Sequence, residues 1–506
     1  MGNGTYVRPL ALYPLILLIP VLLIRLKQGQ ISRPWPGALT VLLAFILAAL
    51  AATAIGATLA PLELRGVDFS DRALRAGVTL IIGVSFFAAA VWMNQSENDL
   101  RFSVKWLLTG LAAHLIWGAI QFVGLNSNHR KQLIEIQNLF SVRGLVKNKR
   151  ISGFAFEPSW LAGQIASLYL PWLVAALLMG YRALNNKRSE PVNQPGTDID
   201  QHLYKRPAEL LLTLQSLARS WIEPVLLVGS LIGIFLTYSR SGLVIAMLAG
   251  IATIILAGGQ SAKTFWSWAR TGFDHKRWTS ISAGLKTVGS RVVFAALVVA
   301  MLIGAATFLA DKGYIAVFFN SEKTDIFSYA VDVFLGPRLA YATAALQAFQ
   351  THPLTGVGLG ASGFGIYQNM PDWILTGVPE IANQMSPTSS LYPNPKNLFV
   401  RLLAETGLSG MVLFMTFYLT LFADALTLLR QRSTPDSIAA RWLGAAGVFA
   451  LAAIVLQGIS QDSFAMPEMW LNLGMLAGAV GALCMPKQIA ASSEPQIVAN
   501  YNSPDS

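Results

Sequence analysis

The chain has 506 residues, of which 54% are hydrophobic and only 12% are charged, and its formal net charge is +11. These values exclude a water-soluble globular protein, because so few charged side chains cannot cover a solvent-exposed surface. The single cysteine, Cys484, excludes an internal disulfide and a thiolate metal cluster. The five histidines lack the spacing of a metal site, so we expect neither a metal nor a cofactor.

Hydrophobic runs predict an all-α, polytopic transmembrane helical bundle with about eleven spans, within a range of about ten to twelve. Only helices that satisfy their own backbone hydrogen bonds can cross lipid in this way. The predicted spans are 9–25, 37–60, 73–93, 104–124, 159–180, 221–238, 241–259, 291–310, 397–421, 438–460 and 466–485. The first span is followed directly by Arg25 and Lys27 without a small-residue cleavage site, which indicates a retained helix.

This pattern divides the chain into four parts. Residues 1–310 form a first membrane region of about eight spans, interrupted by a polar cytoplasmic linker at 185–207. Residues 311–396 form a large external loop, residues 397–486 hold the last three spans, and residues 487–506 are a polar tail that we expect to be disordered. In the loop, apolar spacing from Asp325 to Phe349, broken at Gly336, predicts one or two short surface helices.

Lysine and arginine gather in the connections after the first, fifth, seventh and ninth spans, which predicts that these connections face the cytoplasm. The opposite face then receives segment 126–158, the turn at Arg240, segment 311–396 and the turn between the last two spans. Segment 126–158 is basic despite this placement. Attraction to an anionic substrate or to lipid head groups explains a basic loop there, and an error in the span count would remove the anomaly.

The run from Val225 to Gly259 is apolar except for Ser230, Thr253 and a polar group from Thr237 to Ser241. As one helix it would be roughly 50 Å long, too long for a hydrocarbon core of about 30 Å. Two spans joined by a tight turn fit better, and Arg240 then lies at the membrane surface. A guanidinium is tolerated there and can bind an anion through two parallel hydrogen bonds.

Two further segments carry charge at the external ends of spans. Arg150 and Glu157 precede the fifth span, where Pro158 suits a first helical turn. Glu157 is then either an acidic helix cap or a proton acceptor and substrate ligand beside Arg150. Arg401 and Glu405, four residues apart, are either a structural ion pair or a pair that faces a cavity.

Two other motifs have simpler interpretations. The sequence from Gly358 to Gly363 matches GxGxxG, but no strand precedes it, so we expect a flexible turn rather than a dinucleotide site. Gln461, Asp462 and Glu468 lie in or beside the last external turn. We expect solvated loop residues, with binding of sugar hydroxyls as the alternative.

Several of these stretches together resemble the family of O-antigen ligases and the related O-antigen and exopolysaccharide polymerases. The similar stretches are RISGFAFEPSWLA at 150–162, TYSRSG at 237–242, HPLTGVGLG at 352–360 and NLFVRLLAETGLSG at 397–410. With the span pattern and the large external loop, the resemblance covers most of residues 100–485. It implies a multi-pass enzyme of the bacterial inner membrane, active on the periplasmic face, and hence a periplasmic location for the 311–396 loop.

The resemblance further implies a metal-independent transfer of glycan from an undecaprenyl diphosphate carrier. By position in the similar motifs, Arg240 and Arg150 would bind diphosphate and Glu157 would be the acid/base group. Glu157 and Arg240 would be the catalytic residues. The remaining contacts with the substrate would come from Arg338, Lys396, Asn397 and Arg143. The partners implied are the lipid-linked glycan, membrane lipid and a chain-length regulator protein, with no nucleic acid.

One position departs from the pattern. Ligases of this family often carry a histidine immediately before the asparagine that opens the late span, whereas Lys396 occupies that position here. Lysine is a poor general base unless it is desolvated. The departure favours a polymerase, which joins repeat units, over a ligase, which transfers finished polymer to lipid A core. A lipid-linked oligosaccharide flippase or transporter is the alternative of another class, although mid-span runs such as Val41–Leu50 and Val292–Ile303 carry none of the charges that line a transport path.

Overall fold

The computed structural model describes residues 12–29, 36–59, 62–127, 129–138, 150–181, 222–273, 336–371, 379–389, 391–432, 434 and 437–484. These residues are almost entirely helical, as predicted. The elements in chain order are α1 (Leu12–Lys27), α2 (Gly37–Gly56), β1 (Glu63–Leu64), β2 (Val67–Asp68), α3 (Phe69–Met93), α4 (Glu97–Leu125), α5 (Arg130–Asn138), α6 (Pro158–Gln164), the π-helix η2 (Ile165–Tyr169), α7 (Leu170–Met179), the helix Ile222–Leu236, α9 (Arg240–Phe273), α13 (Gly336–Thr351), α14 (Ser362–Gln368), α16 (Pro379–Met385), α17 (Leu398–Leu429), α18 (Ile438–Gly458) and α19 (Glu468–Cys484).

The predicted spans correspond to helices wherever the structure describes them. Seven helical segments are long and apolar enough to cross a membrane: α2, α3, α4, the continuous run α6–η2–α7, the first part of α9, α17 and α18. The helix Ile222–Leu236 and α19 are shorter apolar helices on two further predicted spans, and α1 lies on the first. The predicted span 291–310, the linker 185–207 and the tail 487–506 lie outside the described residues.

Side-chain caps fix where several helices begin. Asp68 accepts a hydrogen bond from the backbone N of Asp71 at 2.7 Å at the start of α3. Ser96 caps α4 by accepting from Asp99 N at 3.1 Å, so this helix starts earlier than its apolar residues predict. Such caps satisfy N–H groups that have no partner within their own helix.

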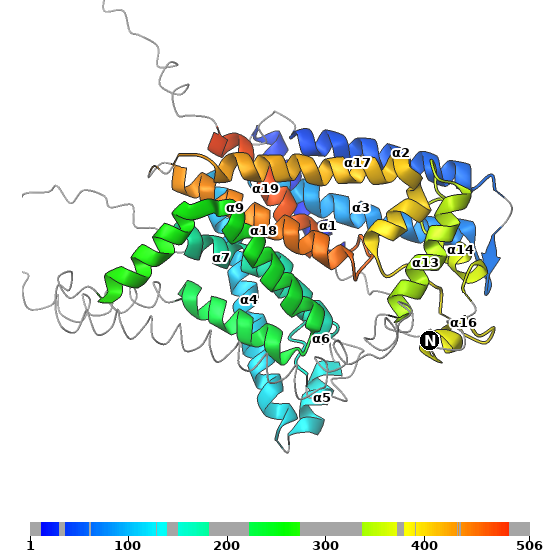
Figure 1. Ribbon diagram of the computed structural model, residues 1–506, viewed down its shortest axis with the longest axis horizontal. Coiled ribbons are helices and arrows are strands. Elements are labelled where there is room, and N and C mark those ends of the chain that lie inside the picture. The colour runs from blue at the N-terminus through cyan, green and yellow to red at the C-terminus, as the bar shows by residue number, and fades with distance from the viewer. Residues whose placement is uncertain are drawn as a thin grey trace, which may run out of the picture.

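The core lies where α17 runs beside α2 and where α18 and α19 pack between them and α3 (Figure 1). Aromatic side chains fill this core, with Phe414 against Phe45 at a centroid distance of 5.0 Å and Phe417 against Phe87 at 5.2 Å. These edge-to-face contacts add to the packing of buried rings.

The π-helix in the fifth span is accompanied by side-chain hydrogen bonds from a neighbouring helix. Asn472 of α19 donates its side-chain N–H groups to the carbonyl oxygens of Ser167 at 2.7 Å and Leu168 at 3.1 Å. Its Oδ1 accepts from Trp172 Nε1 at 2.9 Å. The wider turn of a π-helix is thus matched by a neighbouring amide that pairs with its carbonyls.

Polar contacts mark the two ends of the bundle. At one end, Arg25 pairs with Asp99 at 3.2 Å, and Arg101 pairs with Glu97 at 2.7 Å and donates to Tyr181 Oη at 2.6 Å. The other end holds the β1–β2 hairpin, the loops around α13, α14 and α16, and the turn between α18 and α19 (Figure 1). We call it the loop end.

Two glycines allow the loop after α13 to enter a break in α17. Gly407, with φ +65°, interrupts α17, and a Cβ there would lie 2.4 Å from the carbonyl carbon of Leu354. Gly356, with φ +67°, packs equally closely, 2.5 Å from the carbonyl carbon of Glu405. The GxGxxG turn that follows is therefore closely packed against α17, α2 and α3. Its role is structural, because left-handed glycines permit this close backbone approach.

Candidate functional site

The turn from Thr237 to Arg240 joins two apolar helices, as the sequence predicts, and the Arg150 segment lies against it. The side chain of Arg150 donates from Nε to the carbonyl oxygen of Thr237 at 2.7 Å. The backbone N of Ile151 donates to the carbonyl oxygen of Leu236 at 3.2 Å. Arg150 and Arg240, far apart in the chain, are therefore anchored at one turn.

Glu157 occupies the N-cap position of α6, but its carboxylate does not cap the helix. It accepts a hydrogen bond from Ser159 Oγ at 2.9 Å and is partly exposed. The start of α6 lies against the start of α9, where a Cβ on Gly242 would approach Ala162 Cβ to 2.5 Å. Glu157 therefore holds the predicted N-cap position without a side-chain cap hydrogen bond, and the start of its helix lies at the turn that carries Arg240. We call Arg150 together with the turn from Thr237 to Arg240 the arginine turn, and Glu157 lies beside it at the start of α6.

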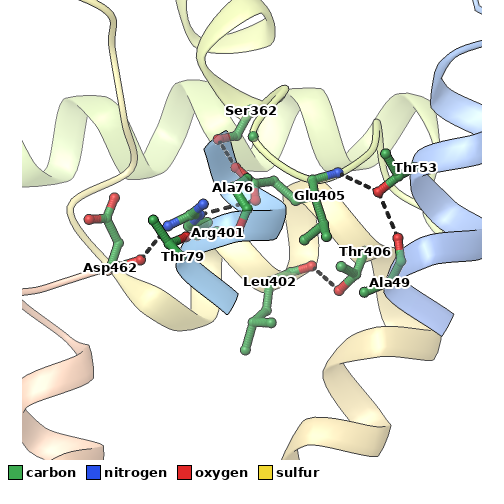
Figure 2. A network of polar contacts seen from close by, with 12 residues as sticks. Ala49, Thr53, Ala76, Thr79, Ser362, Arg401, Leu402, Glu405, Thr406 and Asp462 are labelled. Atoms are coloured by element: carbon green, nitrogen blue, oxygen red, sulfur yellow. Dashed lines mark hydrogen bonds and ion pairs between the residues drawn. The ribbon is translucent and has the colours of Figure 1, made fainter. Parts of the chain in front are cut away.

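A second polar cluster lies inside the first turns of α17 (Figure 2). Arg401 Nε donates to Glu405 Oε2 at 3.0 Å, and the two side chains are only 13% and 3% exposed. Ser362 Oγ donates to Glu405 Oε1 at 2.7 Å. The predicted pairing of Arg401 with Glu405 is confirmed, and the hydroxyl of Ser362 satisfies the second carboxylate oxygen.

The turn between α18 and α19 completes this cluster. Arg401 Nη1 donates to the carbonyl oxygen of Asp462 at 2.6 Å (Figure 2). Asp462 Oδ2 accepts from the backbone N of Lys396 at 3.1 Å. Burial raises the pKa of the Asp462 carboxyl, while the positive charge of Arg401 opposes that rise. Glu468 is 3% exposed. The prediction of a solvated loop residue is therefore wrong for Glu468, whereas Gln461 and Asp462 are half-buried.

Arg72, in the first turn of α3, extends this cluster toward the loop. Its guanidinium carbon lies 3.8 Å from the ring centroid of Tyr392, a cation–π distance. Burial raises the pKa of the Tyr392 phenol. Arg72 directly precedes the predicted span 73–93, and its basic side chain at that edge is the one feature of the sequence that could have indicated a site. Its partner ring, Tyr392, comes from a loop distant in sequence.

The remaining predicted residues lie partly within and partly outside the described residues. Lys396, with φ +51°, places Nζ 5.0 Å from the ring centroid of Tyr341 in α13. Asn397 caps α17 by accepting from Phe399 N at 3.0 Å and Val400 N at 3.1 Å, which is a structural role. Arg338 is exposed near the start of α13. Arg143 lies outside the described residues.

The predicted residues therefore form two groups. One is the arginine turn, and the other is the Arg401–Glu405 cluster with Lys396 and Asp462, which we call the α17 cluster. Guanidinium groups can hold phosphate oxygens in pairs, and a partly exposed carboxylate can accept a proton from a hydroxyl. This combination is suited to displacing an anionic leaving group.

Residues 225–415, which are less than half of the chain, match the family model described as O-antigen ligase. The matched range contains the Arg240 turn, the packed glycine turn and the start of α17, but not Arg150 or Glu157. No curated protein matches the chain.

Proposed function

We propose, on the premise that residues 225–415 are O-antigen ligase-like, that this multi-pass membrane protein is a polymerase-type glycosyltransferase. A hydroxyl oxygen of one lipid-linked repeat attacks the anomeric carbon of another glycan chain. The bond from that carbon to the diphosphate oxygen breaks, and undecaprenyl diphosphate leaves with the electron pair. The transferred chain grows into a surface polysaccharide.

The single observation that supports this proposal best is the contact between Arg150 and the Arg240 turn. Arg150 is fixed by its 2.7 Å hydrogen bond to the carbonyl oxygen of Thr237, three residues before Arg240 at the junction of two apolar helices. In the proposal they bind the diphosphate, whose negative charge grows as the glycosidic bond breaks. Because guanidinium groups supply the positive charge, the proposed transfer is independent of a metal ion.

Glu157 takes the proton of the attacking hydroxyl in this scheme. Its carboxylate is partly exposed at the start of α6, beside the arginine turn, and it is not used as a helix cap. Arg338, Lys396 and, in the basic loop, Arg143 are proposed to contact the rest of the substrate. Asn397 serves them indirectly, because its cap fixes the start of α17 next to Lys396.

Substitution of Arg240 tests the diphosphate role. We expect Arg240→Ala to abolish polysaccharide formation, and Arg240→Lys to be poor as well, because one ammonium cannot reproduce a two-pronged phosphate contact. Product is measured by gel analysis of surface polysaccharide, and membrane insertion by immunoblot of membrane fractions. The matched control is Arg432→Ala, an exposed arginine beyond the opposite end of α17, which should leave the product unchanged. Undiminished polysaccharide from a well-inserted Arg240→Ala protein contradicts the proposal.

Transfer of finished polymer onto lipid A core is the second candidate, favoured by the description of the matching family model. A deletion strain separates the two activities. Loss of long chains with one repeat still attached to core indicates a polymerase, whereas loss of all attached repeats indicates a ligase. The family match gives no support to the flippase alternative.

The proposal also places the protein in the bacterial inner membrane with the loop end in the periplasm. Lipid-linked glycans would reach the site from the membrane, and a chain-length regulator protein is a proposed partner. The basic residues of the loop end would attract the anionic carrier.

A further inference from the structure

Three glutamines lie between the arginine turn and the α17 cluster. Gln164 ends α6, the helix that starts at Glu157, and Gln457 lies in the last turn of α18. Gln461 follows in the turn and is the neighbour of Asp462 in sequence. We call Gln164, Gln457 and Gln461 the amide row. It connects the element that carries Glu157 to the turn that binds Arg401 and Lys396.

The amides of this row are incompletely paired despite their burial. Gln457 is 1% exposed and donates from Nε2 to Gln461 Oε1 at 2.7 Å. The Oε1 atoms of Gln457 and Gln164 are both buried, and neither has a hydrogen-bond partner among the described residues. A buried acceptor without a donor is unfavourable in a folded protein, so each of these two oxygens requires a reason.

Another buried glutamine shows how the same fold satisfies an amide. Gln121 is also fully buried, and its Oε1 accepts from the backbone N of Ser152 at 2.9 Å and of Gly153 at 2.8 Å. Its Nε2 donates to Gln137 Oε1 at 2.9 Å. Gln121 is thus fully paired, whereas Nε2 of Gln137, like the Oε1 atoms of Gln164 and Gln457, is buried without a partner among the described residues.

The surroundings of the amide row suit a neutral, polar ligand. Gly163 lies against Gln457, where a Cβ would approach Nε2 to 2.8 Å, so the absence of a side chain keeps the amide in place. Trp160 lies one turn before Gln164 on the same face of α6 and is partly exposed. Amide groups carry no charge, and a carboxamide oxygen accepts from hydroxyl and N–H groups rather than binding phosphate.

We propose that the amide row is a carbohydrate subsite, which binds sugar hydroxyl or acetamido groups of the glycan next to its diphosphate. This inference rests on the proposed function, because the arginine turn supplies the diphosphate end of the same substrate. Sugar donors satisfy the free oxygens of Gln164 and Gln457, and Gln461 closes the row from the α18–α19 turn. The α17 cluster then lies beyond the sugar.

Binding to the purified full-length protein in nanodiscs tests the subsite. The two probes are undecaprenyl diphosphate and the undecaprenyl-diphosphate-linked oligosaccharide that accumulates in cells lacking this protein. We expect Gln457→Leu and Gln164→Leu each to weaken binding of the sugar-bearing probe about tenfold, the effect of one lost hydrogen bond. Binding of the sugar-free probe should change less than about twofold. Gln461→Ala, at a partly exposed position, provides a variant that does not disturb the buried core.

Thermal stability distinguishes a ligand site from a structural amide. Replacing a buried, unpaired amide by leucine should leave the melting temperature unchanged or higher, while sugar binding falls. Gln431→Leu, at the opposite end of the bundle, is the matched control and should leave both affinities unchanged. Unchanged binding of the sugar-bearing probe in all three amide-row variants overturns the subsite, as does equal weakening of both probes. Arg240→Ala should weaken both probes, so its failure to do so refutes the diphosphate role separately.

Discussion

Glu405 is the most constrained charged residue of the loop end. Its two carboxylate oxygens accept hydrogen bonds from Arg401 and Ser362, and it is almost fully buried within α17. The backbone carbonyl of the same residue accepts from the N of Gly358 at 3.0 Å, so Glu405 also holds the glycine turn. We therefore expect Glu405 to contribute mainly to the stability of the fold.

We predict that Glu405→Gln destabilises the protein by about 3–5 kcal/mol, because it leaves the guanidinium of Arg401 buried without its charge partner. Thermal unfolding in detergent measures the loss. The control is Asp71→Asn, which breaks the pair with Arg75 at 2.8 Å, where both side chains are largely exposed. That change should cost less than about 1 kcal/mol. Equal effects of the two substitutions would show that burial does not govern the Arg401–Glu405 pair.

Asp462 predicts a pH dependence. Burial raises its pKa above the ordinary value of 3.8, so the native state binds this proton more tightly than the unfolded state. Its ionisation therefore lowers the free energy of unfolding as pH rises from about 3.8 through the raised pKa. We expect Asp462→Asn to gain stability relative to the wild-type protein across this window. Stability curves that stay parallel from pH 3 to pH 8 (about the accessible range) are the contrary result.

At the scale of elements, the break in α17 was not predictable from hydrophobic pattern. The run from Leu398 onward reads as one long span, and the structure shows a helix interrupted at Gly407. The break is filled by the backbone of residues 353–355, with Leu408 N donating to the carbonyl oxygen of Pro353 at 2.9 Å. A loop 50 residues upstream determines the shape of this helix.

Gly407→Ala should therefore be strongly destabilising. A Cβ would lie 2.4 Å from the carbonyl carbon of Leu354, at a left-handed φ that alanine adopts at a cost of about 1–2 kcal/mol even without a clash. We expect a lower melting temperature and new proteolytic cleavage in the 353–360 turn. The matched control is Gly77→Ala inside α3, where a Cβ meets nothing within 4 Å. That variant should be as stable as the wild type or slightly more stable. Similar melting temperatures for the two variants would contradict the packing argument.

For the whole molecule, the structure assigns loops to two ends, and this assignment can be tested by labelling. In a Cys484→Ser background, a single cysteine is placed at exposed position 391 of the loop end, at exposed position 129 of the segment 126–158 predicted to be external, or at exposed position 432 beyond the other end of α17. An impermeant maleimide added to cells with a permeabilised outer membrane should label 129 and 391 but not 432. Labelling of 432 together with 129 would disprove the two-ended arrangement, and labelling of 432 alone would place the loop end in the cytoplasm.

The same scale explains why the candidate site divides. The arginine turn comes from helices that pack on α6 and α18, whereas the α17 cluster is built on α3, α17 and the α18–α19 turn. The amide row lies where these two parts meet. The proposed substrate carries a charged diphosphate at one end and neutral sugars at the other. The site has the same order, with the charged arginine turn followed by the neutral amide row.

The sequence by itself determined the membrane class, the all-helical fold and the described spans, because the hydrocarbon core requires long apolar runs and permits few charges. It also placed Arg240 in a turn between two helices, from the length of an apolar run alone. Pairing of Arg401 with Glu405 followed from helical spacing.

Only the tertiary structure decided which of these residues meet. Arg150 donates to the Thr237 carbonyl oxygen, and Asp462 accepts hydrogen bonds from Lys396 and Arg401. Glu157 occupies the N-cap position of α6 without a side-chain cap hydrogen bond. Arg72 stacks on Tyr392, and the Oε1 atoms of Gln164 and Gln457 are buried without partners among the described residues. The contacts among these residues join segments that are far apart in the chain, so no local sequence pattern predicts them. Hydrophobic pattern specifies how a helix faces lipid, but which side chains face each other across helices depends on packing of the whole bundle.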